Sequence, residues 1–143
     1  MYEDYSRQAL PSKRYRELLG SAICVFNSNN QFIIENILKI DASNYTWYSL
    51  IDMQSGNLKG PIKSTITEKH DAEVANLFEE IVAKRNRIVH SFQVTENGDQ
   101  VLRTKEKKGG EQFTITEDYL LKFIENNQAL SDLLYDVRDK EKA

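Results

Sequence analysis

The chain has 143 residues, of which 40% are hydrophobic and 29% charged, as in a folded globular protein and unlike a disordered or low-complexity segment. The length fits a single domain over residues 1–143. A formal net charge of −3 excludes a generally basic protein that coats nucleic acid, although it permits a local basic site. No stretch approaches the roughly 20 apolar residues of a membrane span, no apolar signal core is present, and there is one cysteine. We therefore expect a soluble cytoplasmic protein without a membrane partner.

The first periodic segment predicts a long helix from about Pro11 to Ile40. Its apolar residues recur at steps of three and four, which places them on one helical face. The polar run Asn27-Ser28-Asn29-Asn30 interrupts the pattern. Because asparagine and serine compete with the helix for backbone hydrogen bonds, we expect a kink or a weakened stretch there.

A second, shorter helix is expected after Ser43, ending near Gly56. Its aromatic residues Tyr45, Trp47 and Tyr48 are interpreted as part of the core. The stretch from Gln54 to Ser64 holds two glycines and one proline, and it therefore predicts a loop.

A third helix is predicted to begin near Thr67 or Asp71 and to run to about Phe92. Its apolar residues form one stripe, its acidic residues come early, and its basic residues come late. Both charge placements suit the helix dipole.

The pattern then changes to short alternating segments on either side of Asn97-Gly98, which is a strong signal for a β-hairpin. A third strand is expected over Gln112–Ile115, and Thr116 is expected to cap a last helix. The sequence thus predicts a mainly α fold. Four helices form a bundle, with a small antiparallel β-meander (about residues 92–115) between the third and fourth helices.

The end of the third helix carries the one cluster of side chains suited to chemistry. At about 100° per residue, Asn86 and His90 lie one turn apart on one face, which also holds Glu79. Arg85 lies ~140° from His90 and projects along the apolar stripe. Such an arginine either extends its charged end to solvent over its apolar stem or needs a partner or cavity. Spacing alone leaves both interpretations open.

Other polar residues give weaker signals. His70 is interpreted as an exposed polar residue near a helix start, and Cys24 as a small buried hydrophobic residue. The sequence has no second histidine at helical spacing, no cysteine pair and no phosphate-binding glycine loop. We therefore expect no metal site and no cofactor.

The segment Arg85-Asn86-Arg87-Ile88-Val89-His90 resembles the signature of the HEPN superfamily, in which four to six residues separate an arginine and a histidine. The best-known form is RNxxxH, placed at the C-terminal end of the third helix of a four-helix domain. The hairpin before the last helix also resembles a subset of this superfamily that is associated with bacterial abortive infection.

The resemblance implies a metal-independent endoribonuclease that works as a homodimer, with one composite cleft formed by the motifs of two subunits. It implies that Arg85, Asn86 and His90 are catalytic, and that cleavage of RNA leaves a 2′,3′-cyclic phosphate and a 5′-OH. It also suggests a toxin or phage-defence effector with an antitoxin or immunity protein as partner. Some such toxins carry a tyrosine two residues after the histidine, which a partner enzyme modifies, but this chain has Phe92 there.

Two further alternatives remain open from the sequence. Lys84, Arg87 and the run Arg103–Lys108 supply local positive charge for an RNA backbone, or else the run is a solvated turn. The same helical surface also fits a non-catalytic dimeric module that binds RNA or a partner protein. A small-molecule-binding bundle has only the aromatic residues near position 47 in its favour.

Overall fold

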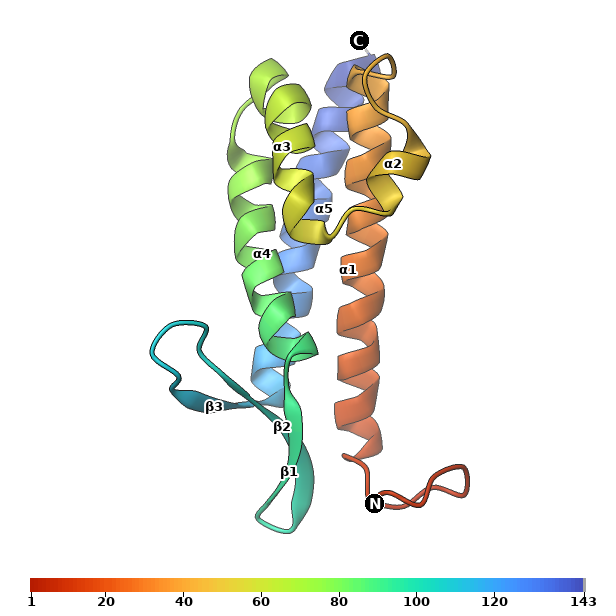
Figure 1. Cartoon of the computed structure of the whole chain (residues 1–143). Coiled ribbons are helices and arrows are strands. Elements are labelled where there is room, and N and C mark those ends of the chain that lie inside the picture. The colour runs from red at the N-terminus through yellow and green to blue at the C-terminus, as the bar shows by residue number, and fades with distance from the viewer. Residues whose placement is uncertain (143) are drawn as a thin grey trace.

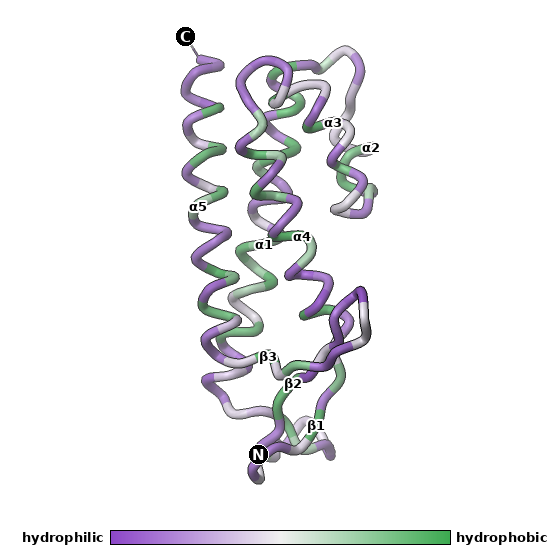
Figure 2. Tube along the Cα trace, turned by 90° about the vertical axis from the view of Figure 1, so that its left-hand side faces the viewer, coloured by the Kyte–Doolittle hydropathy of each residue, from purple (hydrophilic) through white to green (hydrophobic). Residues whose placement is uncertain are grey.

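Three long helices run side by side along most of the molecule (Figure 1). In the computed structural model, which describes residues 1–142, these are α1 (Lys13–Ile40), α4 (Glu73–Val89) and α5 (Glu117–Lys142). Figure 2 shows hydrophobic and hydrophilic positions alternating along α1 and α5, as expected when each helix turns one apolar stripe toward its neighbours. The mainly α character predicted from the sequence is confirmed.

One cluster of buried apolar side chains connects the three long helices with the shorter elements. It includes residues that are completely or almost completely buried, among them Leu18, Ile33, Ile37, Leu50, Ile62, Ile81, Ile115, Phe123 and Leu134. The fold is therefore built around a continuous core, in which the hydrophobic effect supplies most of the stabilisation.

Helix α1 is continuous through residues 27–30, so the predicted kink is wrong. Asn29 is buried, and its amide nitrogen donates to the backbone oxygen of Asn127 on α5 at 2.8 Å and to the side-chain oxygen of Asn127 at 3.1 Å. Asn30 donates to the Ser55 hydroxyl at 2.9 Å. The asparagines thus bond to other elements of the fold and do not disrupt their own backbone.

The described residues hold five α-helices where the sequence predicted four, because the predicted loop over 54–64 is helical. Helix α2 (Trp47–Ile51) is followed by a 3₁₀ turn, η1 (Ser55–Leu58), by α3 (Lys59–Ile62) and by a π-helical turn, η2 (Lys63–Thr67). Pro61 stands in the first turn of α3, where its missing N–H breaks no helical hydrogen bond.

The segment from η1 to η2 packs against the bundle through apolar residues spaced four apart. Leu58, Ile62 and Ile66 are fully buried, whereas Gly56 and Gly60 face outward. Helix α2 begins after Thr46, which caps it in a reciprocal pair with Ser49, and not after Ser43 as predicted.

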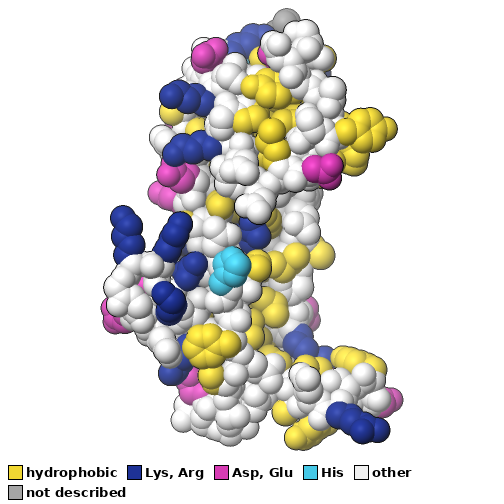
Figure 3. All heavy atoms as spheres, viewed as in Figure 1, with side chains coloured by type: hydrophobic (Ala, Val, Ile, Leu, Met, Phe, Trp, Pro, Cys, Tyr) yellow, Lys and Arg dark blue, Asp and Glu magenta, His cyan; other side chains and the backbone are white. Residues whose placement is uncertain are grey.

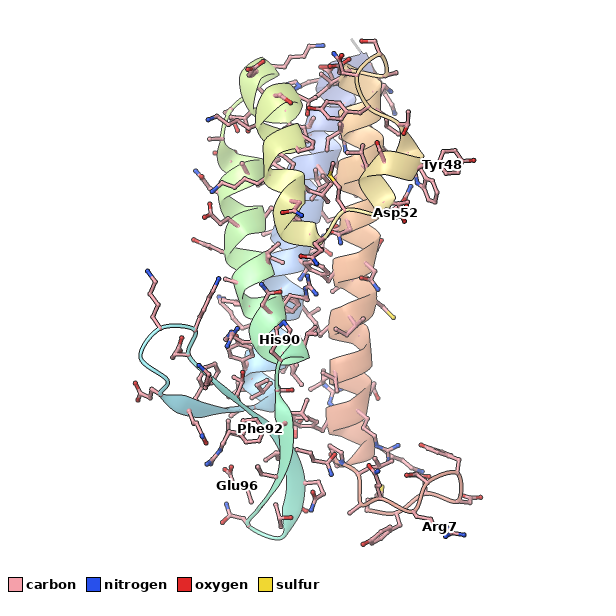
Figure 4. All side chains as sticks on the ribbon, viewed as in Figure 1. Arg7, Tyr48, Asp52, His90, Phe92 and Glu96 are labelled. Carbon is pink, nitrogen blue, oxygen red and sulfur yellow. The ribbon has the colours of Figure 1, made fainter. Side chains whose placement is uncertain are left out.

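Of the three aromatic residues around α2 that the sequence assigned to the core, Tyr45 packs against the core, whereas Trp47 and Tyr48 do not belong to it. Trp47 is 41% exposed and Tyr48 is 77% exposed, with Tyr48 projecting from the surface in Figure 4, and Tyr45 is half-buried. Helix α2 has only five residues, and within it Leu50 alone is buried.

The three-stranded antiparallel sheet lies at one end of the bundle, between α4 and α5 in the chain (Figure 1). Strands β1 (Phe92–Glu96), β2 (Asp99–Lys105) and β3 (Gln112–Ile115) pair in chain order, which confirms the predicted meander. Asn97 and Gly98 form its two-residue turn with φ of 52° and 83°, as the Asn-Gly pair predicted.

A tyrosine on α1 fixes the sheet to the bundle. The Tyr15 hydroxyl donates to the Ile115 carbonyl at 2.6 Å and accepts from the Leu102 N–H at 3.1 Å. Strands β2 and β3 are therefore both held against α1.

Among the residues that the structure describes, no helix is both long and apolar enough to span a bilayer.

Candidate active site

Helix α4 ends earlier than the sequence predicted, and this determines the setting of His90. The helix stops at Val89, His90 is its C-cap, and Phe92 is the first residue of β1 and not part of the α4 stripe. The cause is strand pairing, because Phe92 lies opposite Arg103 in the β1–β2 ladder and must leave the helix to do so.

The main chain at His90 is held on both sides. Its N–H donates to the Asn86 carbonyl at 2.9 Å, and its carbonyl accepts from the Thr104 hydroxyl of β2 at 3.3 Å. The Ser91 hydroxyl donates to the Ile88 carbonyl at 2.6 Å and closes the helix end. His90 itself is exposed, and Figure 4 shows it at the end of α4 on the face turned to the viewer.

Arg85 lies over an aromatic ring in the interior. Its guanidinium carbon is 5.0 Å from the centroid of Phe26 on α1, a cation–π distance. Phe26 in turn stacks on Phe78 (centroids 6.3 Å apart) and Phe123 (6.2 Å). Arg85 is half-buried, and it projects along the apolar stripe as its helical position predicted.

The environment of Arg85 leaves part of its hydrogen-bonding capacity unused. Within residues 1–142, its Nε is buried without a partner, and no ion pair involves its guanidinium. Burial lowers the pKa of Arg85, but an arginine starts far enough above neutrality to stay charged. A charged group with donors to spare is suited to an anionic ligand.

Asn86 faces a different side of α4. It is half-buried and lines a groove of about 380 Å³, together with Glu79, which the sequence placed on the same helical face. The only hydrogen bond among the described residues that joins the three predicted catalytic residues is the backbone bond from His90 to Asn86. One protomer thus brings Arg85, Asn86 and His90 to one end of α4 without linking their side chains.

Basic side chains gather next to His90. The Arg87 guanidinium donates to the Lys105 carbonyl and ties α4 to β2, and the turn that follows carries exposed Lys107 and Lys108. Figure 3 shows lysine and arginine side chains beside the histidine, over the end of α4 and the β2–β3 turn. The Arg103 guanidinium instead forms an ion pair on the sheet with the Glu96 carboxylate, 3.2 Å away. The local surface is therefore basic although the chain as a whole is acidic.

Two apolar side chains flank the same histidine. Val89 is 48% exposed and Phe92 is 44% exposed, and Figure 4 places Phe92 below His90 on one face. Exposed apolar residues beside a functional group are common where a second protein surface covers them.

Three features of the structure were not predicted. Phe26 supports Arg85 from a helix far away in sequence, and Thr104 holds the His90 carbonyl from the sheet. Cys24 is exposed and not buried. No sequence signal marks Phe26 or Thr104, because both contacts depend on how the elements pack.

The second histidine is far from this site. His70 is 12% exposed and lies 3.1 Å from Glu141 near the end of α5, so it is not the exposed residue expected from the sequence. In the described part of the chain, no three histidine, cysteine or acidic side chains form a group that could hold a metal ion.

Comparisons of this chain with protein-family models, with curated proteins and with solved structures found no match. The resemblance to the HEPN superfamily therefore stays a prediction that rests on the RNxxxH segment.

Proposed function

We propose that this protein is a metal-independent endoribonuclease of the HEPN type. The observation that carries the proposal is the exposed imidazole of His90, held by its main chain at the end of α4 beside a basic surface. Histidine titrates near neutrality and is the usual side chain for proton transfer. The neighbouring lysine and arginine side chains suit a polyanionic substrate.

RNA supplies its own nucleophile for the reaction. His90 in its neutral form removes the proton from a 2′-OH, and the oxygen attacks the adjacent phosphorus. The bond from phosphorus to the 5′-oxygen then breaks, and that oxygen takes a proton. The products are a 2′,3′-cyclic phosphate and a 5′-OH. Because the nucleophile belongs to the substrate and the proton carrier to the protein, no metal ion is needed.

In this proposal, Arg85 and Asn86 support the chemistry at His90. The charged guanidinium of Arg85 offers fixed donors to the phosphate oxygens, on which charge builds up in the transition state. Asn86, one turn before His90, has an amide that orients the substrate.

We further propose that a homodimer forms the complete site. The reaction needs one base and one acid, and each protomer supplies one histidine at this place. Exposed Val89 and Phe92 provide the apolar surface that a partner protomer would cover. A twofold axis beside them would bring two His90 side chains into one cleft.

The test is incubation of the purified protein with total RNA or tRNA in EDTA. The native protein is expected to cut RNA and leave cyclic phosphate ends, which mass spectrometry identifies. Arg85→Ala/His90→Ala should be inactive, whereas His70→Asn, which changes the other histidine, should cut normally. Intact RNA with the native protein, or equal cutting by the double variant, would refute the proposal.

In the cell, such an activity would make the protein a toxin or phage-defence effector, with an antitoxin or immunity protein as partner. Induced expression is then expected to arrest growth, and the double variant should relieve the arrest. Normal growth on expression of an active enzyme would exclude this role.

A non-catalytic dimeric module is the second candidate. The observation in its favour is the exposed apolar pair Val89 and Phe92, which fits protein binding without any chemistry. Light scattering combined with the RNA assay separates the two: a dimer that binds RNA or a partner but never cuts RNA supports the module.

A further inference from the structure

A groove lies next to the candidate site, between α4, the segment formed by η1 and α3, and the β2–β3 turn. Its volume of about 380 Å³ is within the range of small-ligand sites. Apolar side chains from two helices line it, of which Ala75 and Ala83 are accessible and Ile62, Phe78 and Val82 are buried. Apart from Asn86, the proposed cleavage chemistry uses none of the residues that line the groove, so the groove needs a separate explanation.

Charged side chains surround the apolar lining. Lys59, Arg87 and Lys107 contribute three positive charges, and Glu79 and Glu106 contribute two negative ones. Lys59 and Glu79 are 3.4 Å apart, but both are mostly exposed, so their attraction is weak and either can turn to another partner. The rim therefore carries a small excess of positive charge, and Lys108 of the same turn adds to it.

Asn86 connects the groove to His90. It lines the groove, and its carbonyl accepts the His90 N–H at 2.9 Å, so the groove begins one helical turn before His90 on α4. Within the described chain, the Asn86 side chain makes no hydrogen bond, and its amide can both donate to and accept from a ligand.

We propose that this groove is a nucleobase-binding subsite for the RNA strand that is cut at His90. An unstacked base has flat apolar faces and a polar edge, and its own phosphate carries a negative charge. The apolar lining receives the faces, Asn86 bonds to the edge, and Arg87 and Lys107 attract the phosphate. The inference rests on the proposed ribonuclease function, because it takes the same RNA strand as the ligand, and it restricts the substrate to single-stranded RNA.

A binding experiment tests the subsite without cleavage. All variants carry His90→Ala, and fluorescence anisotropy measures the Kd of a labelled 2′-O-methyl hexaadenylate. Ala83→Trp fills the groove from an exposed helix position and should raise the Kd about tenfold, the size of a lost base contact. Ala129→Trp, at an exposed position of α5 outside the groove, should change the Kd less than about twofold. Equal affinities of the two variants would overturn the subsite.

A second variant, Lys107→Gln, tests the subsite independently in case Ala83→Trp fails to fold. Lys107→Gln removes a rim cation from an exposed turn, and it should weaken binding and lower the salt slope of log Kd by about one. Lys122→Gln, on the exposed side of α5, is the matched control and should leave the slope nearer that of the parent. An unchanged slope for Lys107→Gln would contradict the role of the rim.

Two small ligands distinguish recognition of the base from attraction of a phosphate. Adenosine monophosphate should shift the NMR amide signals of Ala75, Ala83 and Asn86, and ribose 5-phosphate, which has no base, should not. Equal shifts by both would overturn base recognition. Shifts that appear only on raising the protein concentration would show that a second copy of the chain occupies the groove, which would also overturn it.

The outcomes separate this inference from the proposed function. RNA cutting by the native protein together with no groove-dependent binding would refute the subsite alone. Groove-dependent binding together with a native protein that never cuts RNA would refute the ribonuclease and leave a nucleotide-binding groove.

Discussion

Two sets of polar side chains in this bundle differ in how their hydrogen bonds are satisfied. Between α1 and α5, the buried Asn29 and Asn127 bond to each other, and the Asn127 amide also donates to the Phe123 carbonyl at 2.9 Å. At the end of α4, the described residues give the buried Nε of Arg85 no partner, and His90 is exposed. The first arrangement satisfies its polar groups internally and is structural. The second leaves capacity for a ligand, at some cost in stability.

His90→Ala should give the largest effect on RNA cleavage. It should also distinguish the residues proposed for catalysis from those that stabilise the fold. If His90 is the proton carrier, cleavage of RNA in EDTA should fall by about 10²–10⁴-fold, the usual contribution of such a group. Stability should change by less than about 0.5 kcal/mol, because the ring is exposed and the backbone bonds remain. Rate assays and urea unfolding measure the two quantities. A full-rate variant would remove His90 from the mechanism.

Asn127→Ala should show the reverse pattern. It removes the bonds that the Asn127 side chain makes to Asn29 and to the Phe123 carbonyl in a buried place, which should cost about 1–3 kcal/mol of unfolding free energy. The rate of RNA cleavage by the folded protein should not change. Asn126→Ala is the control, because Asn126 is the neighbouring residue in the sequence and is less buried. If Asn127→Ala lost activity without losing stability, the structural role proposed for Asn127 would be wrong.

Arg85→Met sharpens the comparison, since it tests whether the fold itself needs the arginine. The change loses a cation–π contact worth about 0.5–1 kcal/mol, but it also removes a buried donor that lacks a partner in the described structure. We expect stability to be unchanged or to rise by up to about 1 kcal/mol, while cleavage is lost.

Arg85→Lys is the companion variant. It retains a charge but not the planar fork of donors, and it should recover little activity. Marked destabilisation by Arg85→Met would instead show that Arg85 serves mainly to cover the core.

The pH dependence of stability should reveal the smallest effect, at the far end of α5. Lys69 and His70 hold the pKa of the nearly buried Glu141 below its usual value of 4.5, mainly through the hydrogen bond from Lys69. Because the folded pKa is lowered, this stabilisation is complete above pH 4.5 and is lost as the pH falls through the folded pKa.

Urea unfolding at a series of acidic pH values measures this loss. Glu141→Gln should make the unfolding free energy fall less steeply with decreasing pH in the acidic range. It should leave RNA cleavage unchanged, since Glu141 bonds to Lys69 and His70 and takes no part in the candidate site. An unchanged slope in the acidic range would show that the cluster of Lys69, His70 and Glu141 contributes nothing to stability.

Part of the fold could be predicted because its signals are local. Helical periodicity predicted α1, α4 and α5, and Asn97-Gly98 predicted the hairpin, since few other residues accept two positive φ values in succession. The segment over 54–64 could not be predicted in the same way. Its glycines and Pro61 have low helix propensity, but burial of Leu58 and Ile62 against the bundle outweighs it.

The candidate site was predictable only as a stretch of sequence. The spacing of Arg85, Asn86 and His90 placed them near a helix end, and the direction of Arg85 along the apolar stripe followed from geometry. The stopping point of α4 did not follow, because it depends on the pairing of Phe92 with Arg103. The groove beside Asn86 could not be predicted either, because residues from η1, α3, α4 and the β2–β3 turn form it.

By itself, therefore, the sequence determined the long helices, the hairpin and the chemical identity of the residues at the end of α4, since these depend on near-neighbour spacing and side-chain type. Only the tertiary structure decided which polar groups are paired. It bonded Asn29 to Asn127, placed Arg85 on Phe26 and left His90 exposed, because such contacts join residues distant in the chain and arise from packing.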